Sequence, residues 1–193
     1  MRLILVSHGE TEENVKGILQ GHTPGKTTTR GMRTVRELAL SLKAEKIDAI
    51  FSSDLKRAEY TAREIARFHD IPIHFNKELR EINVGVFQGR SKEVFHVKQQ
   101  ESGVSLARFK PKGGESMEDA RKRAIRFANK IYGKYENKTI LFSTHRGFIG
   151  CLLSSYLHIS LAEARKIKLK NAAMIILDIK GFRVKMVKNT MSK

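Results

Sequence analysis

The stretch RLILVSHG, residues 2–9, decides the fold class of the chain. Residues 2–6 are rich in Leu, Ile and Val, and such a run bounded by a glycine predicts a buried β-strand. The strand ends in Ser7, His8 and Gly9, so a histidine stands at its carboxyl end. Ligands of α/β sheets bind at the carboxyl ends of the parallel strands. His8 is therefore the first candidate site residue.

Similar apolar runs follow along the chain, with helical segments between them. We predict strands at residues 47–51, 71–75 and 138–144, and helices at 10–20, 30–45, 52–68, 91–100, 116–135 and 160–169. Residues 172–179 and 182–187, on either side of Gly181, predict an antiparallel hairpin. This alternation indicates an α/β fold with a mostly parallel sheet, covered by helices on both faces and followed by the C-terminal antiparallel hairpin.

Length and composition predict a globular chain. It has 193 residues, of which 40% are hydrophobic and three are proline, so we expect a single domain over residues 1–193. The apolar runs are too short to span a bilayer, and residues 1–9 lack the pattern of a signal peptide. The single cysteine, Cys151, excludes an intramolecular disulfide and is typical of a reducing compartment. We therefore expect a cytoplasmic protein with no membrane partner.

The charge of the chain is strongly positive. Lys and Arg number 37 and Asp and Glu number 20, which gives a formal net charge of +17, and most of the excess follows residue 90. Such a field attracts phosphorylated metabolites, nucleic acid or other anionic partners without choosing among them. A solvated basic surface without a partner is an equally good interpretation.

Two more basic side chains follow predicted strands in the same way as His8. His145 comes directly after the strand at 138–144, and Arg57 lies early in the helix that follows the strand at 47–51. Together with free N–H groups at the helix starts, they would form an anion-binding edge. Taken singly, each histidine is more often a structural hydrogen-bonding group, and Arg57 a surface residue. No His or Cys pair with metal-ligand spacing is present, so we expect neither a metal nor another cofactor.

Five segments then carry a resemblance. LVSHGETEEN, FSSDLKRAEYTA, ELREINVGVFQG, GGES and STHRG occur in that order between Leu3 and about Leu153. Each segment alone is weak, but the ordered set resembles the histidine phosphatase superfamily in its phosphoglycerate-mutase-like branch. The resemblance covers most of the chain.

The resemblance implies a catalytic role for four residues. His8 would be the nucleophile that becomes phosphorylated, Arg57 and His145 would bind the phosphoryl oxygens, and Glu81 would be the general acid and base. Asn14, Gln20 and Gly21 match substrate-side positions of the first motif and the loop after it. Without the resemblance, an ion pair with Arg80 would be the simpler interpretation of Glu81.

Two positions depart from the family pattern. The first motif of the family has an arginine, which contacts phosphate, where this chain has Ser7. The second motif commonly has a small residue after its histidine, where this chain has Arg146. We therefore count Ser7 and Arg146 among the candidate substrate-binding residues. Arg146 either replaces the missing charge or points to solvent.

Three functions agree with these observations. The first is a phosphatase that hydrolyses a small phosphorylated metabolite through a phosphohistidine, since the short segment between Glu81 and Gly113 is similar to that of compact phosphatases. The second is a phosphoglycerate mutase. The third is a weakly active or inactive protein that binds phosphorylated ligands or nucleic acid, which Ser7 and the net charge favour. Basic residues of the short segment would bind a second anionic group of the substrate or are simply solvated: Lys92, Lys98, Arg108, Lys110 and Lys112.

Overall fold

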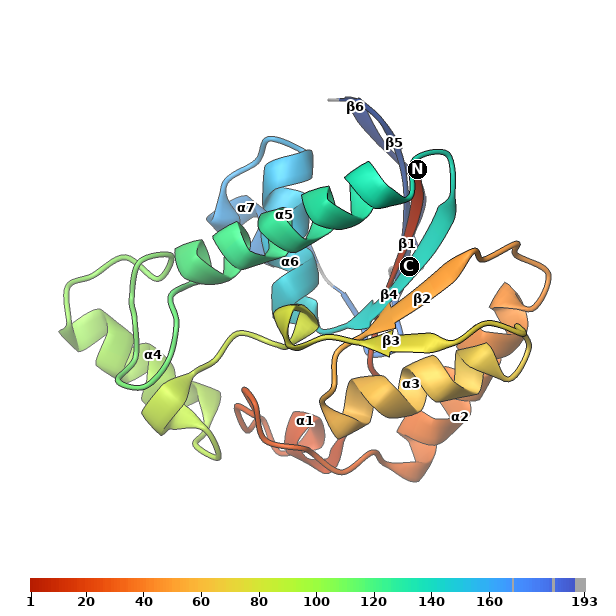
Figure 1. Cartoon of the computed structure of the whole chain (residues 1–193). Coiled ribbons are helices and arrows are strands. Elements are labelled where there is room, and N and C mark those ends of the chain that lie inside the picture. The colour runs from red at the N-terminus through yellow and green to blue at the C-terminus, as the bar shows by residue number, and fades with distance from the viewer. Residues whose placement is uncertain (168, 182, 190–193) are drawn as a thin grey trace.

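The computed structural model of the chain describes residues 1–167, 169–181 and 183–189. Six strands form one sheet in the order β3-β2-β4-β1-β5-β6 (Figure 1). The first four in this order are parallel, whereas β5 is antiparallel to β1 and β6 is antiparallel to β5. The strands are β1 (Arg2–Ser7), β2 (Ala49–Ser52), β3 (Ile73–Phe75), β4 (Thr139–Thr144), β5 (Met174–Lys180) and β6 (Arg183–Asn189). The predicted fold class, a mostly parallel α/β sheet with a C-terminal antiparallel hairpin, is confirmed.

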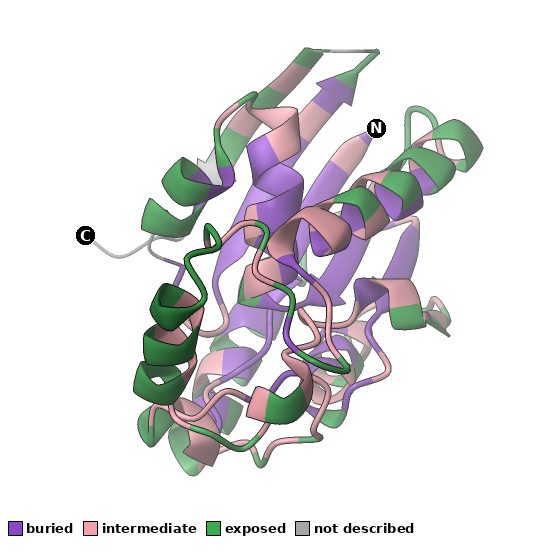
Figure 2. Cartoon of the chain, turned by 90° about the vertical axis from the view of Figure 1, so that its left-hand side faces the viewer, coloured by how far each residue is buried: buried purple, intermediate pink, exposed green. Residues whose placement is uncertain are grey.

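Helices cover both faces of the sheet because the buried strands are apolar on both sides. Leu3 and Leu5 of β1 share a hydrophobic cluster with helices α5 (Met117–Lys134) and α6 (Arg146–Tyr156). The alternate residues Ile4 and Val6 belong to the cluster on the other face. Helices α2 (Thr29–Leu42) and α3 (Lys56–Ala66) cover that face. Figure 2 shows the resulting layer of buried strands.

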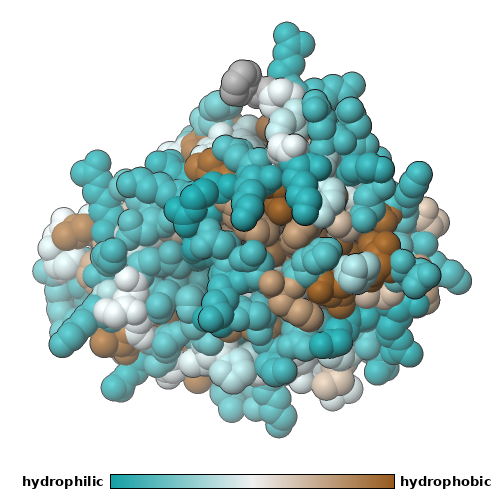
Figure 3. Space-filling model, viewed as in Figure 1, coloured by the Kyte–Doolittle hydropathy of each residue, from teal (hydrophilic) through white to brown (hydrophobic). Residues whose placement is uncertain are grey.

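The described part of the chain also contains three shorter α-helices: α1 (Glu12–Val15), α4 (Lys92–Glu101) and α7 (Leu161–Lys166). Helix α4 projects away from the sheet and has no buried residue (Figures 1 and 2). Hydrophilic side chains dominate the face of the molecule shown in Figure 3, as the excess of charged residues predicts. In the described part of the chain, none of the helices has the length and apolar composition needed to cross a bilayer.

The register of the two central strands decides where the site residues lie. β1 and β4 are parallel neighbours, and Ser7 pairs with Thr144 at their carboxyl ends. His8 and His145 therefore follow at equivalent positions of adjacent strands. β2 flanks β4 on its other side, with Ser52 opposite Ser143, so the segment that leads into α3 reaches the same edge.

Several predicted boundaries differ from the observed ones. The helix expected at 10–20 is limited to α1, because the chain turns at Gly17 with a positive φ of 68°. The helix expected at 52–68 begins only at Lys56, and its N-cap residue is Leu55. Residues 79–90, which lie between the predicted strand at 71–75 and the predicted helix at 91–100, are irregular apart from a 3-10 turn at Gly85–Phe87. A second such turn, Lys77–Leu79, overlaps the start of this stretch.

The C-terminal part also follows the prediction with shorter elements. Helix α7 ends at Lys166, while the predicted helix extends to 169; residue 168 is outside the described residues, as is residue 182 of the predicted hairpin. The long helix α5 begins as predicted, because the Ser116 hydroxyl accepts the Asp119 N–H and the Asp119 carboxylate accepts the Ser116 N–H.

Candidate active site

His8 follows β1 and is almost fully buried, with 4% of its surface exposed. Its Nδ1 lies 2.7 Å from the carbonyl oxygen of Gly9. Because a carbonyl oxygen only accepts, the neutral ring carries its proton on Nδ1 and its lone pair on Nε2. Burial, together with the positive charges of Arg57 and Arg146, lowers the pKa of His8 to about 3. The ring is therefore an uncharged nitrogen nucleophile at neutral pH.

Arg57 brings a positive charge into the same buried region. Its guanidinium donates to the carbonyl oxygens of Thr23 at 2.6 Å and Gly21 at 2.8 Å, which holds the loop after α1 in place. Burial lowers the pKa of Arg57 to about 10, so it remains charged at neutral pH. Its Nε is buried and has no partner among the described residues. An oxyanion would supply the missing acceptor.

His145 lies beside His8 at the neighbouring strand end. The two ring centroids are 5.3 Å apart, and His145 is fully buried. Its Nε2 lies 2.8 Å from the hydroxyl of Ser53, whose oxygen also accepts the N–H of Leu55. Burial and the charge of Arg57 hold the pKa of His145 well below its ordinary value. Its Nδ1 is buried without a partner in the described part of the chain, as is Nε of Arg57.

Glu81 reaches this site from the irregular segment after β3. Its two carboxylate oxygens accept the backbone N–H groups of Ile82 at 2.8 Å and Gly147 at 3.2 Å. A Cβ atom at Gly147 would lie 2.2 Å from Glu81 Oε1, so a larger residue there would displace the carboxylate. Gly147, which could have let backbone approach a ligand, instead makes room for Glu81. Gly9 similarly admits the backbone of Gly31 in α2.

Arg123 of α5 fixes the segment that carries Glu81. Its guanidinium donates to the carbonyl oxygens of Glu78, Arg80 and Glu81, and pairs with Glu115 at 2.6 Å. The Glu115 carboxylate also accepts the N–H of Asn83. His22 Nε2, 2.9 Å from the Glu81 carbonyl oxygen, is a further contact to the same segment. The Glu81 backbone is therefore held from two sides.

These residues surround a pocket of about 390 Å³ at the carboxyl edge of the sheet. His8, Arg57 and Glu81 line it. So do four of the candidate substrate-binding residues, which are Asn14, Gln20, Gly21 and Arg146. His145 does not line the pocket; it lies behind, in ring contact with His8. One end of the pocket thus gathers the Arg57 cation and the neutral His8 ring, and Glu81 is the only carboxylate in the lining among the described residues.

Ser7 is placed differently from the prediction. Its side chain is fully buried and outside the pocket lining, with its hydroxyl donating to the Lys170 carbonyl and accepting the Ala173 N–H. The Ser7 hydroxyl thus holds the loop before β5 rather than facing a ligand. The reason is that Ser7 is still part of β1, where the segment before β5 runs beside it and the Ser7 N–H donates to the Ala173 carbonyl oxygen.

Arg146 and the basic residues between Glu81 and Gly113 differ in whether they line the pocket or lie at the surface. Arg146 is solvent-exposed yet lines the pocket, close enough to His8 for its charge to lower the pKa of that ring. Lys92 also lines the pocket. Lys98, Arg108 and Lys110 instead form ion pairs with neighbouring carboxylates, Glu101, Glu118 and Asp119. In residues 1–167, 169–181 and 183–189 no cluster of His, Cys, Asp and Glu side chains is arranged to hold a metal ion.

Sequence reasoning missed several residues of this site. Ser53 falls within the helix predicted at 52–68, but its position directly after the end of β2 is a signal that it reaches the same edge as His145. Arg123, Glu115 and His22 act through contacts between residues far apart in the chain, which no local pattern reveals. The pocket-lining residues of α7 lie equally far from the motifs.

The lowered pKa of His8 predicts a pH dependence of stability. Below the ordinary histidine pKa of 6.5, the unfolded chain binds a proton that folded His8 does not bind until about pH 3. The free energy of unfolding should therefore fall as the pH is lowered from 6.5. In His8→Gln, urea unfolding at a series of pH values should give a slope shallower by about 1.4 kcal/mol per pH unit. Equal slopes for both proteins would contradict a neutral buried His8.

Comparisons with known proteins agree with this site. The Salmonella typhimurium adenosylcobalamin/alpha-ribazole phosphatase is 28% identical, over 98% of this chain and 96% of the relative. A probable phosphoglycerate mutase GpmB from Proteus mirabilis is 31% identical, over 92% of this chain and 85% of the relative. Among solved structures, phosphoserine phosphatase from Entamoeba histolytica superimposes with a TM-score of 0.87 at 28% identity, covering 100% of this chain and 98% of that one.

A second solved structure, the alpha-ribazole phosphatase from Shigella flexneri, gives a TM-score of 0.87 at 25% identity and covers 99% of this chain and 96% of that one. The sequence profile of the histidine phosphatase superfamily, branch 1, matches residues 3–190, which is nearly the whole chain. The chain therefore belongs to the histidine phosphatase superfamily.

Proposed function

We propose that the protein is a phosphatase that hydrolyses a small phosphomonoester through a phosphohistidine at His8. The observation that carries the proposal is the group of buried polar atoms without partners around His8. Nε of Arg57 and Nδ1 of His145 lack partners among the described residues, next to a neutral histidine whose lone pair is on Nε2. A phosphoryl group bound there would supply oxygen acceptors for the cation and for a protonated Nδ1.

In the first step, the lone pair of His8 Nε2 attacks phosphorus and the bond from phosphorus to the ester oxygen breaks. The departing oxygen takes a proton from the protonated carboxyl group of Glu81. Arg57 and His145 bind the equatorial oxygens, where the negative charge is concentrated. The Ser53 hydroxyl, by donating to His145 Nε2, keeps the His145 proton on Nδ1.

In the second step, water attacks the phosphohistidine and gives a proton to the Glu81 carboxylate. The phosphorus–nitrogen bond breaks, inorganic phosphate leaves, and the lone pair returns to Nε2. Every proton is accounted for by Glu81 and water, so the cycle needs no metal or cofactor. A cytoplasmic location and a single catalytic domain over residues 1–193 belong to the same proposal; the buried, free Cys151 agrees with a reducing compartment.

A phosphoglycerate mutase is the second candidate, and the similarity to GpmB favours it. A mutase returns the phosphoryl group to a second hydroxyl of the substrate, whereas a phosphatase transfers it to water. Product analysis with phosphoglycerates separates the two, because release of inorganic phosphate without an isomer supports the phosphatase.

Rapid quenching with a labelled phosphomonoester should trap an acid-labile, base-stable phosphoprotein. His8→Ala should give no such label and should lower the hydrolysis rate by several orders of magnitude, because it removes the nucleophile. Hydrolysis by His8→Ala at near the wild-type rate would rule out the mechanism.

Glu81→Gln should slow hydrolysis of alkyl phosphates about 10²–10⁴-fold, since an alkoxide needs a proton as it leaves. An activated aryl phosphate needs none, so its single-turnover phosphorylation should slow much less. Equal losses for the two substrates would show that Glu81 does not protonate the leaving group.

Arg123→Ala should reproduce the leaving-group dependence of Glu81→Gln in milder form, because Arg123 acts only by holding the Glu81 segment. Arg123→Lys retains one donor and should recover part of the activity toward alkyl phosphates. A loss that is the same for alkyl and aryl phosphates would indicate a general structural defect instead.

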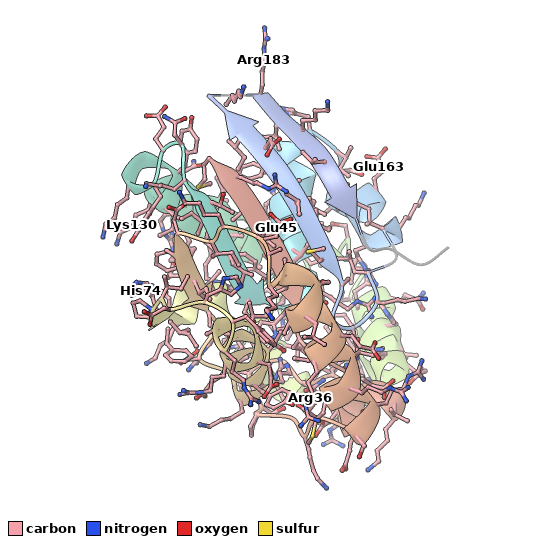
Figure 4. All side chains as sticks on the ribbon, turned by 90° about the vertical axis from the view of Figure 1, so that its right-hand side faces the viewer. Arg36, Glu45, His74, Lys130, Glu163 and Arg183 are labelled. Carbon is pink, nitrogen blue, oxygen red and sulfur yellow. The ribbon has the colours of Figure 1, made fainter. Side chains whose placement is uncertain are left out.

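Arg146→Ala should lower kcat/KM for phosphomonoesters about tenfold, because it removes a pocket-lining charge next to His8. The matched control is Arg183→Ala, an exposed arginine at the hairpin tip (Figure 4). If the two variants have the same kinetics, Arg146 does not supply the positive charge of the phosphate-binding arginine that is absent at position 7.

A further inference from the structure

The pocket extends from its end at His8, where the phosphoryl group would bind, toward a second hollow. The second hollow, of about 430 Å³, shares Leu106, Met117 and Arg165 with the pocket that contains His8. It lies between α7 and the loop that follows α4. A ligand bound at His8 therefore has room to extend toward α7, where Arg165 lines both spaces.

The walls between His8 and Arg165 are largely apolar. They come from the loop after α4, the start of α5, helix α6, and α7 with the residues after it: Leu106, Met117, Gly150, Ala164, Ile167 and Leu169. Such a surface binds an apolar group through the hydrophobic effect and offers few partners to a sugar or polyol.

Arg165 is a cation without a counter-charge. Met117 at the start of α5 lines the second hollow with Arg165, and the carboxylates of the next two residues have other partners: Glu118 pairs with Arg108 and Asp119 with Lys110. Glu163 of α7 caps its own helix by accepting the Ser160 N–H, and it lies at the surface in Figure 4. The Arg165 side chain is exposed, lines both hollows, and has no ion pair within the described ranges; partial desolvation lowers its pKa. An unpaired cation on the wall of a pocket attracts an anionic ligand.

We propose that the substrate is a phosphomonoester whose alcohol carries an extended apolar group with a second anionic group at its far end, and that Arg165 binds this second group. The inference rests on the proposed function, because the phosphoryl group at His8 fixes one end of the ligand. Since apolar walls separate the two cationic positions, a compact phosphorylated acid gains nothing from Arg165. Arg165 therefore selects long anionic substrates over short ones.

The test compares two series of non-hydrolysable ligands by calorimetry at low salt. One series consists of alkylphosphonates of increasing chain length, and the other of the same phosphonates with a terminal carboxylate. At the chain length that spans the apolar walls, the carboxylate should lower Kd about fivefold to tenfold. Arg165→Gln should abolish this preference, while Arg183→Gln, an equal charge change at the hairpin tip, should keep it.

The outcomes separate this inference from the proposed function. Equal Kd values for the two series at every length, or a preference that survives Arg165→Gln, would overturn the inference even if an aryl phosphate is hydrolysed normally. If no phosphonate binds and no aryl phosphate is hydrolysed, the proposed function fails and the inference fails with it.

Discussion

The buried guanidinium of Arg57 is the constraint on which the rest of the site depends. A charge in the interior is tolerated only when its surroundings compensate for lost water. Here the carbonyl oxygens of Gly21 and Thr23 take that role, which holds the loop after α1 against α3. The same charge helps to keep both histidine rings neutral. One buried cation thus orders a loop, helps to leave His8 uncharged, and keeps an N–H without a partner among the described residues.

A site residue can be predicted from the sequence when strand pairing sets its position. It cannot be predicted when its position depends on contacts with residues far away in the sequence. Parallel pairing of Ser7 with Thr144 makes His8 and His145 neighbours, and this follows from two apolar runs that end in histidine. Glu81 is predicted from the family resemblance alone. Local patterns could not indicate the Arg123–Glu115 pair, which links α5 to the segment after β3, or the pocket lining supplied by α7. Ser7 was misplaced for the same reason, because its partners, Lys170 and Ala173, come from the other end of the chain.

The structure explains why this chain has Ser7 where the family has an arginine. The Ser7 side chain is fully buried between hydrogen bonds to the loop before β5, and an arginine in that space would require the loop to move. Positive charge at the pocket comes instead from α6, where Arg146 begins the helix directly after His145. Much of the basic segment around α4 is neutralised by local ion pairs, which leaves Lys92 facing the pocket. Most of the excess positive charge thus lies on the surface, and only a few of the basic residues line the pocket.

The central claim is that Nε2 of His8 receives the phosphoryl group between Arg57 and His145. A crystal structure with orthovanadate, which imitates the five-coordinate phosphorus of the transfer, tests it most directly. We expect vanadium bonded to His8 Nε2, with Arg57 Nε and His145 Nδ1 within hydrogen-bond distance of the equatorial oxygens. Vanadate bound through another residue, or bound at His8 with Arg57 and His145 still without contacts, would contradict it.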